Sequence, residues 1–243
     1  MRTQIRRGAA AALAVSALFF TAACGGSSDK ASDKSGEKPA GQEAPKKDDA
    51  AGAGALTEAQ MTAATLELKD LPAGWKAGEI TPPTTEDYKA DNPDCQPIAA
   101  MMADKIAGAT MGKPAEFERE AGSYQLSQRI YTFPGTTGAA DHMKALGTSL
   151  DACPGFSVTE QGTTFEVGVK KLTTPKAGDA SHAFRLYMEI AGMQMKFETD
   201  LFVVSQGAGA TQIAFIPSDA AGHKDFDDLA KRAGDKFVKG AKS

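Results

Sequence analysis

The first 55 residues divide into a short apolar run and a long polar one. Residues 8–20, GAAAALAVSALFF, carry no charge and follow three arginines, Arg2, Arg6 and Arg7. A helix needs roughly 20 apolar residues to cross a bilayer, so this run is too short to span one. A basic start before a short apolar core is typical of a secretory signal peptide. Residues 25–55 contain no aromatic and no large aliphatic side chain, which predicts a disordered linker because nothing offsets the entropy of ordering it.

Amphipathic patterns beyond residue 56 predict four helices. The first begins at Thr57, whose hydroxyl can form a capping box with Gln60. Its expected core face consists of Met61, Ala64, Thr65 and Leu68. The other three are predicted directly after Cys95 as far as Gly108, from residue 136 or 137 to Cys153, and from about 224 to 239.

Strict alternation of apolar and polar residues predicts the strands. They fall at residues 115–121, 123–133, 165–169, 184–190, 193–203 and 211–216. Ala191 and Gly192 are expected to link two of them as a hairpin. A meander of strands with helices at both ends predicts a single α+β domain, an antiparallel sheet flanked by helices that cover one face.

The apolar run ends in a sequence that identifies a class of exported protein. Thr21-Ala22-Ala23-Cys24 resembles the lipobox of bacterial lipoproteins, although leucine is more usual in the position of Thr21. The resemblance implies that Cys24 carries a diacylglyceryl group and a further acyl chain such as palmitate. It also implies cleavage before Cys24. The alternative is an ordinary signal peptide cut after Ala23.

These boundaries give three segments and a location. Residues 1–23 are the lipoprotein signal peptide, 24–55 the lipidated cysteine and disordered linker, and 56–243 a sensor-like α+β domain. As a coil, the 31 residues of 25–55 span roughly 30 Å r.m.s.. We therefore expect a domain held by its lipid anchor on the extracytoplasmic face of the cell membrane.

Charge narrows the possible partners. Without residues 1–23 the chain has 24 Lys and Arg against 31 Asp and Glu, a formal charge of −7. This balance argues against nucleic acid as a partner. The expected partners are the membrane, through the lipid anchor, and an apolar or amphipathic ligand or an envelope protein.

Two cysteines remain after Cys24 is assigned to lipid. Cys95 and Cys153 lie in a chain expected to be exported, and paired cysteines are typical of an oxidising compartment. The prediction is a disulfide that joins the start of the second helix to the end of the third. Two reactive thiols are the alternative.

The layout as a whole resembles a known family. A lipobox, a polar linker, a helical start through Leu71-Pro72-Ala73-Gly74-Trp75, and Cys95 and Cys153 at helix ends are similar to actinobacterial lipoproteins related to the extracellular sensor domain of PknH-type kinases. The resemblance covers about residues 56–240. It implies an antiparallel sheet flanked by helices around a cleft that binds an extracellular ligand. Domains of that type carry two disulfides, whereas this chain can form one.

Known catalytic and metal-binding patterns are missing from the sequence. It contains no GxSxG, P-loop or HExxH motif, and SxxK occurs only within the polar linker, at Ser27–Lys30 and Ser35–Lys38. His142, His182 and His223 are 40 or more residues apart. Three acids near the start of the last helix, Asp225, Asp227 and Asp228, are better explained by the helix dipole than by a metal. We therefore expect no enzyme activity, no catalytic residue, no metal and no cofactor.

Methionine is the side chain that most suggests binding, because it suits adaptable apolar surfaces. A speculative ligand site consists of Met101, Met188, Met193 and Met195, although ordinary core packing is the preferred explanation of these residues. Three functions stay open: a non-catalytic ligand-binding or sensor-like lipoprotein, a protein-interaction module of the envelope without a small-molecule site, and a hydrolase whose site the sequence hides.

Overall fold

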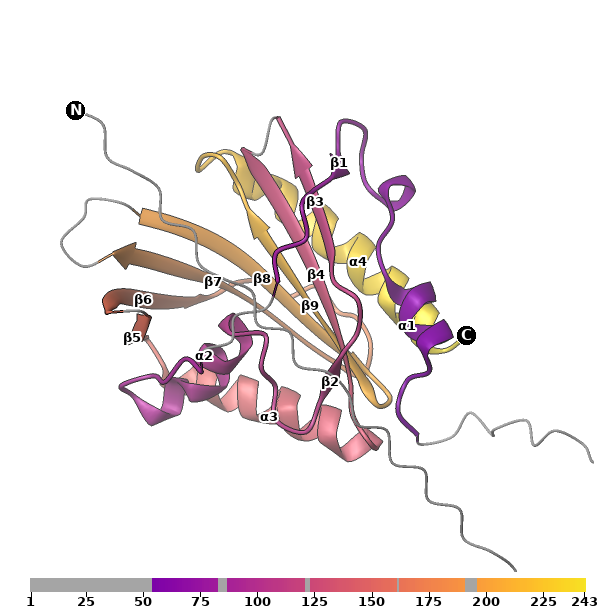
Figure 1. Ribbon diagram of the computed structural model, residues 1–243, viewed down its shortest axis with the longest axis horizontal. Coiled ribbons are helices and arrows are strands. Elements are labelled where there is room, and N and C mark those ends of the chain that lie inside the picture. The colour runs from indigo at the N-terminus through magenta and orange to yellow at the C-terminus, as the bar shows by residue number, and fades with distance from the viewer. Residues whose placement is uncertain (1–53, 83–86, 121–122, 161, 191–195) are drawn as a thin grey trace, which may run out of the picture. The chain divides into compact units, whose positions relative to one another are not determined.

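The computed structural model describes residues 54–243 apart from 83–86, 121–122, 161 and 191–195. All of them belong to the second of two compact units of the chain, Asp49–Ser243. Within this described part, nine strands form one antiparallel sheet with the order β1-β3-β4-β9-β8-β7-β6-β5, and β2 pairs with β4 (Figure 1). The predicted antiparallel sheet flanked by helices is therefore confirmed.

The elements have the following bounds. The strands are β1 Lys76–Ala77, β2 Thr110–Met111, β3 Ala115–Arg119, β4 Tyr124–Thr132, β5 Gly155–Glu160, β6 Thr163–Lys171, β7 Ala180–Ile190, β8 Lys196–Gln206 and β9 Gly209–Ile216. The α-helices are α1 Glu58–Ala64, α2 Gln96–Met102, α3 Thr136–Ala152 and α4 Phe226–Ala241, and short 3₁₀ turns occupy Leu68–Asp70, Pro93–Cys95 and Gly222–Asp225.

The strand order combines two antiparallel pieces. Strands β5 to β9 form a meander in which each pairs with the next. Strand β9 also pairs with β4, so it joins the meander to the β3–β4 hairpin. Strand β5 was not among the predicted strands. The β7–β8 pairing is the predicted hairpin, but its expected link, Ala191 and Gly192, lies outside the described residues.

Helices cover parts of both faces of the sheet, not one face as expected. Phe202 and Val204 of β8 pack in a cluster with α1 and α4, whereas Leu201 and Val203 pack in a cluster with α2 and α3. Successive side chains of a strand point to opposite faces, so β8 lies between two cores. In Figure 1, α3 and α2 lie together on one side and α4 runs along the other.

The first helix is shorter than the periodicity indicates. The capping box of Thr57 and Gln60 is present, but α1 ends at Ala64. The next segment leaves the helix because the Leu66 N–H donates to the side-chain oxygen of Gln128 on β4, at 2.7 Å. Leu68, expected on the core face, is 46% exposed. A long-range hydrogen bond therefore overrides a local pattern.

The disulfide joins Cys95 and Cys153, whose Cα atoms lie 5.2 Å apart. Cys95 directly precedes α2 and Cys153 directly follows α3. Both side chains are buried in the cluster beneath these helices. The bridge therefore connects the start of α2 to the end of α3, as predicted.

We expect the purified oxidised domain to contain no free thiol. In the chain-entropy model, a bridge across 58 residues stabilises by about 4 kcal/mol. The double variant Cys95→Ala/Cys153→Ala should therefore unfold at a markedly lower urea concentration. Thiol titration of the denatured, unreduced chain from Gly25 onward tests the first point. Two reactive thiols per chain would show that the cysteines are unpaired.

Candidate functional site

A cleft of about 420 Å³ lies beside α2 over strands β3, β4 and β9. Side chains of β4 and β9 that are paired in register line it: Gln125 with Ile216, and Ser127 with Ala214. Its other lining residues are Thr81, Pro82, Tyr88, Met102, Asp104, Glu116 and Arg129. One part of the lining is apolar and another carries hydroxyl, amide and charged groups, which is the usual composition of a small-molecule site.

Three charged side chains meet at the polar end of this cleft. The Arg129 Nε atom donates to Asp104 Oδ2 at 3.0 Å, and its Nη1 atom lies 2.6 Å from Glu116 Oε1. Their side chains are 8%, 15% and 13% exposed in the order Arg129, Asp104, Glu116. Tyr131 adds a hydroxyl hydrogen bond to Asp104 at 3.2 Å. Two carboxylates thus share one guanidinium.

Asp104 adopts a backbone conformation that normally favours glycine. It follows α2 with φ +54°, and the next amide, of Lys105, donates to the Ala100 carbonyl at 2.9 Å. The Asp104 amide donates to the Met101 carbonyl at 3.1 Å, which completes a Schellman motif. A left-handed non-glycine residue costs about 1 kcal/mol. The carboxylate of Asp104 offsets this cost because it binds both Arg129 and Tyr131.

Burial raises the pKa of two side chains in this cluster, Glu116 and Tyr131. Burial raises the pKa of Glu116, and the nearby Arg129 guanidinium opposes that rise. Burial also raises the pKa of Tyr131, and the charge of Asp104 adds to the effect. Tyr131 therefore keeps its proton and acts as a hydrogen-bond donor to Asp104.

The described methionines of the speculative site lie around one apolar cluster. Met101 is 1% exposed in the core beneath α3, and Met188 is partly buried against the same cluster. Its neighbour Met102 lines the cleft, whereas Met188 lines a separate hollow of about 470 Å³ over β5–β8. Met193 and Met195 lie outside the described residues. A role of these methionines in ligand binding stays a prediction.

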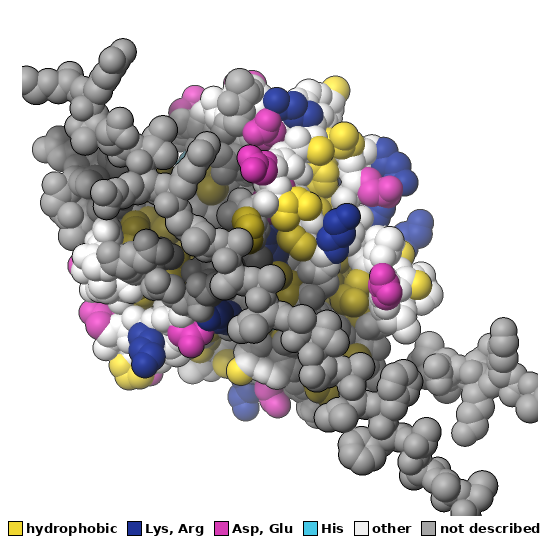
Figure 2. All heavy atoms as spheres, in the orientation of Figure 1, with side chains coloured by type: hydrophobic (Ala, Val, Ile, Leu, Met, Phe, Trp, Pro, Cys, Tyr) yellow, Lys and Arg dark blue, Asp and Glu magenta, His cyan; other side chains and the backbone are white. Residues whose placement is uncertain are grey.

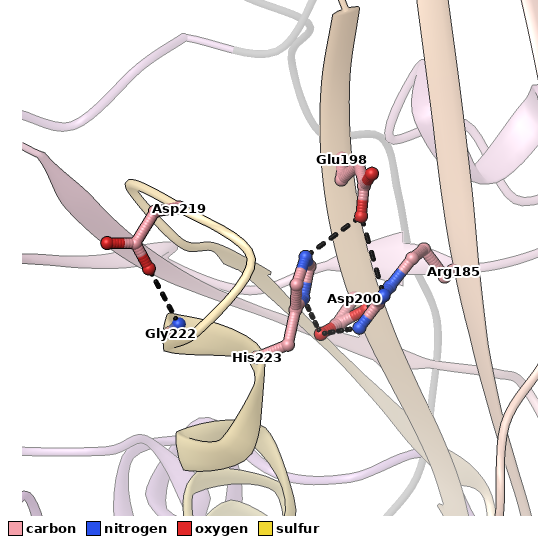
Figure 3. Close-up of polar contacts among 6 residues, drawn as sticks. All are labelled: Arg185, Glu198, Asp200, Asp219, Gly222 and His223. Atoms are coloured by element: carbon pink, nitrogen blue, oxygen red, sulfur yellow. Dashed lines mark hydrogen bonds and ion pairs between the residues drawn. The ribbon is translucent and has the colours of Figure 1, made fainter.

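A second polar cluster joins the turn before α4 to strands β7 and β8. Arg185 binds the fully buried Asp200 through two hydrogen bonds of 2.5 and 3.0 Å. His223 approaches the same carboxylate with Nδ1 at 2.5 Å and reaches Glu198 with Nε2 at 2.9 Å. Figure 3 shows the imidazole standing between these two acids of β8.

Figure 3 also shows why this cluster differs from a catalytic dyad. A buried Asp–His pair is a common base, but the base needs a nitrogen available to a nucleophile. Both His223 nitrogens already face carboxylates, Asp200 and Glu198. The side chains of Arg185, Glu198, Asp200 and His223 thus contact one another. The geometry of this cluster fits an anchor for the start of α4.

A third cluster holds the other side of the same helix start. The Arg119 guanidinium donates to Asp225 at 2.9 Å, and its Cζ atom lies 4.3 Å from the Tyr124 ring centre and 5.2 Å from that of Trp75. Trp75 is 8% exposed in the core with α4. Asp225, weighed above as a metal ligand, is thus the partner of an arginine.

The histidines have separate local partners. His142 of α3 packs against Phe133, and burial lowers its pKa to about 4, with a smaller contribution from His182. A ring nitrogen of His182 lies 3.1 Å from the Met143 carbonyl oxygen. Among the residues that the structure describes, no group of three or more His, Cys, Asp or Glu could hold a metal ion.

On the side of the domain visible in Figure 2, acidic and basic side chains are interspersed with apolar ones.

No protein-family model and no curated protein sequence matches the chain. The crystal structure of the extracellular domain of PknH from Mycobacterium tuberculosis matches with a TM-score of 0.55 and 13% identity, over 77% of this chain and 97% of that one.

This chain has the fold of the PknH extracellular domain. The structure of an uncharacterised protein from Mycobacterium smegmatis, an ortholog of Rv0999, is similar with a TM-score of 0.43 and 12% identity, over 77% of this chain and 98% of that one. The PknH match confirms the fold that the cysteine placement and element order indicated. At this identity it concerns the fold alone.

Sequence reasoning missed the central charged residues of the first two clusters, Arg129 and Asp200. Arg129 and Asp200 occupy the polar phase of strands, and a polar phase is ordinarily interpreted as facing solvent. Asp104 gave no signal either, because the helix was expected to continue as far as Gly108, whereas α2 ends at Met102. No spacing in the sequence connects Asp104 with Glu116 and Arg129, because the pairing of β3 with β4 brings Glu116 to Arg129 and the end of α2 brings Asp104 there.

We expect Arg185→Met to destabilise the domain by about 3 kcal/mol, because it removes a partner from the fully buried Asp200. Urea unfolding followed by the fluorescence of the single tryptophan, Trp75, measures this loss. Arg232→Met is the control, since it breaks an exposed pair with Asp228 and should hardly change stability. Equal effects of the two substitutions would contradict the proposed anchoring role of the Arg185 cluster.

Proposed function

We propose that this chain is an extracytoplasmic lipoprotein whose domain binds a small ligand in the cleft beside α2 and performs no catalysis. The cleft is the observation that carries the proposal. It combines an apolar wall, hydrogen-bonding groups of β4 and a buried charged cluster within about 420 Å³. A concave, largely preformed site with a few polar groups is the usual form of a small-molecule site.

The membrane anchor rests on the sequence before the domain. The lipobox-like residues ending at Cys24 and the polar stretch 25–55 support attachment through lipid. In the described part of the chain, no helix is long and apolar enough to cross a membrane.

A non-catalytic role is supported by the contacts of His223, the strongest candidate for a catalytic base. His223 presents both nitrogens to carboxylates, so activating a nucleophile would first require one of these contacts to break. The fold of the PknH extracellular domain is consistent with a sensor-like role. The interaction-module alternative has less support, because the exposed large apolar residues of the described part lie on separate segments: Leu68 in a 3₁₀ turn, Ile80 in a loop and Phe197 on β8.

Cys24→Ala should abolish lipidation and leave the protein unprocessed or released from the membrane, because the acylated sulfur is lost. Membrane fractionation and intact mass of the protein made in its own host measure this change. Ser27→Ala, three residues along the chain, should leave the protein acylated and in the membrane fraction. A fully processed Cys24→Ala protein that stays in the membrane would contradict the anchor.

Native mass spectrometry of protein purified from its own host tests ligand binding. The unaltered protein should carry a small co-purified molecule, which Ser127→Trp should exclude because the indole would occupy the cleft between β4 and β9. Thr159→Trp is the control, on an exposed position of β5 outside the cleft. An adduct that persists in Ser127→Trp would place the ligand elsewhere, and its absence from the unaltered protein would weigh against binding.

A further inference from the structure

We propose that the cleft is selective for a small amphipathic amine, a molecule with one cationic nitrogen and an apolar chain or ring. This inference rests on the proposed function, because it names the ligand class of the same cleft. It follows from the charges that line the polar end and from the apolar groups that line the wall.

The charges of the lining favour a cation. Asp104 and Glu116 contribute two negative charges and Arg129 one positive charge, which leaves the lining with a net charge of −1. The Arg129 guanidinium uses its Nε and Nη1 atoms on these two carboxylates, so it is already engaged and is a poor receptor for an anionic ligand. All three side chains are at least 85% buried, where weaker solvent screening strengthens Coulomb interactions.

Neighbouring lysines do not cancel this charge. Lys105, next to Asp104, places its ammonium 2.7 Å from Asp87 and lines a different hollow, which Asp104 and Tyr131 also line. Lys76 pairs with Glu118 at 2.8 Å on the β1–β3 side of the sheet. Neither lysine lines the cleft.

The wall of the cleft suits the apolar part of such a ligand. Met102 at the end of α2 and Ile216 at the end of β9 present aliphatic surface, and Tyr88 presents an aromatic ring. A ring face attracts an ammonium group as well as an alkyl chain. The hydroxyl of Ser127, which also lines the cleft, can accept a hydrogen bond from an ammonium donor.

The backbone conformation of Asp104 supports a function for its negative charge. Glycine would occupy the left-handed position after α2 without strain, and asparagine would tolerate it too. The chain instead places a carboxylate there, beside the cleft and 3.0 Å from Arg129. An asparagine at this position would keep the turn and the shape of the cleft while removing the negative charge.

Three six-carbon probes that differ in their head group test this selectivity. Hexylamine, 1-hexanol and hexanoate are titrated at pH 7 into the chain from Gly25 to Ser243, which keeps every described residue and needs no detergent. Amide and methionine-methyl NMR shifts report binding near Ser127 and Met102. We expect hexylamine to bind about tenfold more tightly than hexanoate, because one unit of negative charge that solvent partly screens favours the cation over the anion by roughly this factor.

Substitutions on one strand give a matched comparison. Glu116→Gln should weaken hexylamine binding several-fold and leave hexanol binding unchanged, because it neutralises the lining but keeps its shape. Glu118→Gln changes the net charge of the protein equally, on the same strand β3, but at a position paired with Lys76 and outside the cleft lining. It should have less than a twofold effect, and Asp104→Asn should behave like Glu116→Gln.

The outcomes separate the ligand class from the proposed function. Hexanoate binding as tightly as hexylamine, or equal effects of Glu116→Gln and Glu118→Gln, would overturn the amine assignment. Failure of all three probes to shift the cleft resonances would overturn it too. Loss of the co-purified molecule in Ser127→Trp is measured independently, so ligand binding in the cleft would stand if that loss were observed and fall if it were not.

Discussion

The pairing of β4 with β9 is the interaction on which the rest of the domain depends. It joins the β3–β4 hairpin to the meander of β5 to β9. The two strands pair in antiparallel register from Gln125↔Ile216 to Thr132↔Gly209. Without it, β3 and β4 would form an isolated hairpin, which is marginally stable in water. With it, one continuous sheet carries a hydrophobic core on each face.

The same pairing creates the cleft. Ser127 lies opposite Ala214 and Gln125 opposite Ile216, so hydroxyl and amide groups stand beside small and aliphatic side chains in one lining. The disulfide then fixes the start of α2 to the end of α3. At the other end of α2, Asp104 lies beside Arg129 and binds it. The cleft is thus set by one strand pairing and one covalent link.

The buried ionic groups divide between two roles. Around Asp200, Arg185 binds the carboxylate and each imidazole nitrogen of His223 faces a carboxylate, which suits the anchoring of a helix start. Around Arg129 two carboxylates share one cation beside an open cavity. An excess of negative charge beside a cavity favours a cation, because Coulomb interactions are weakly screened there.

The sequence by itself determined the types of the elements and the covalent link. Period-two alternation located most of the strands, the Thr57–Gln60 pair located the first helix, and two cysteines in a chain expected to be exported predicted the disulfide. These signals are local or compositional, so one sequence contains them. Tertiary structure alone decided where α1 ends, since the Leu66 amide binds Gln128. It also decided that Arg129 is buried, because periodicity shows which face of a strand is polar but not which distant charges meet it.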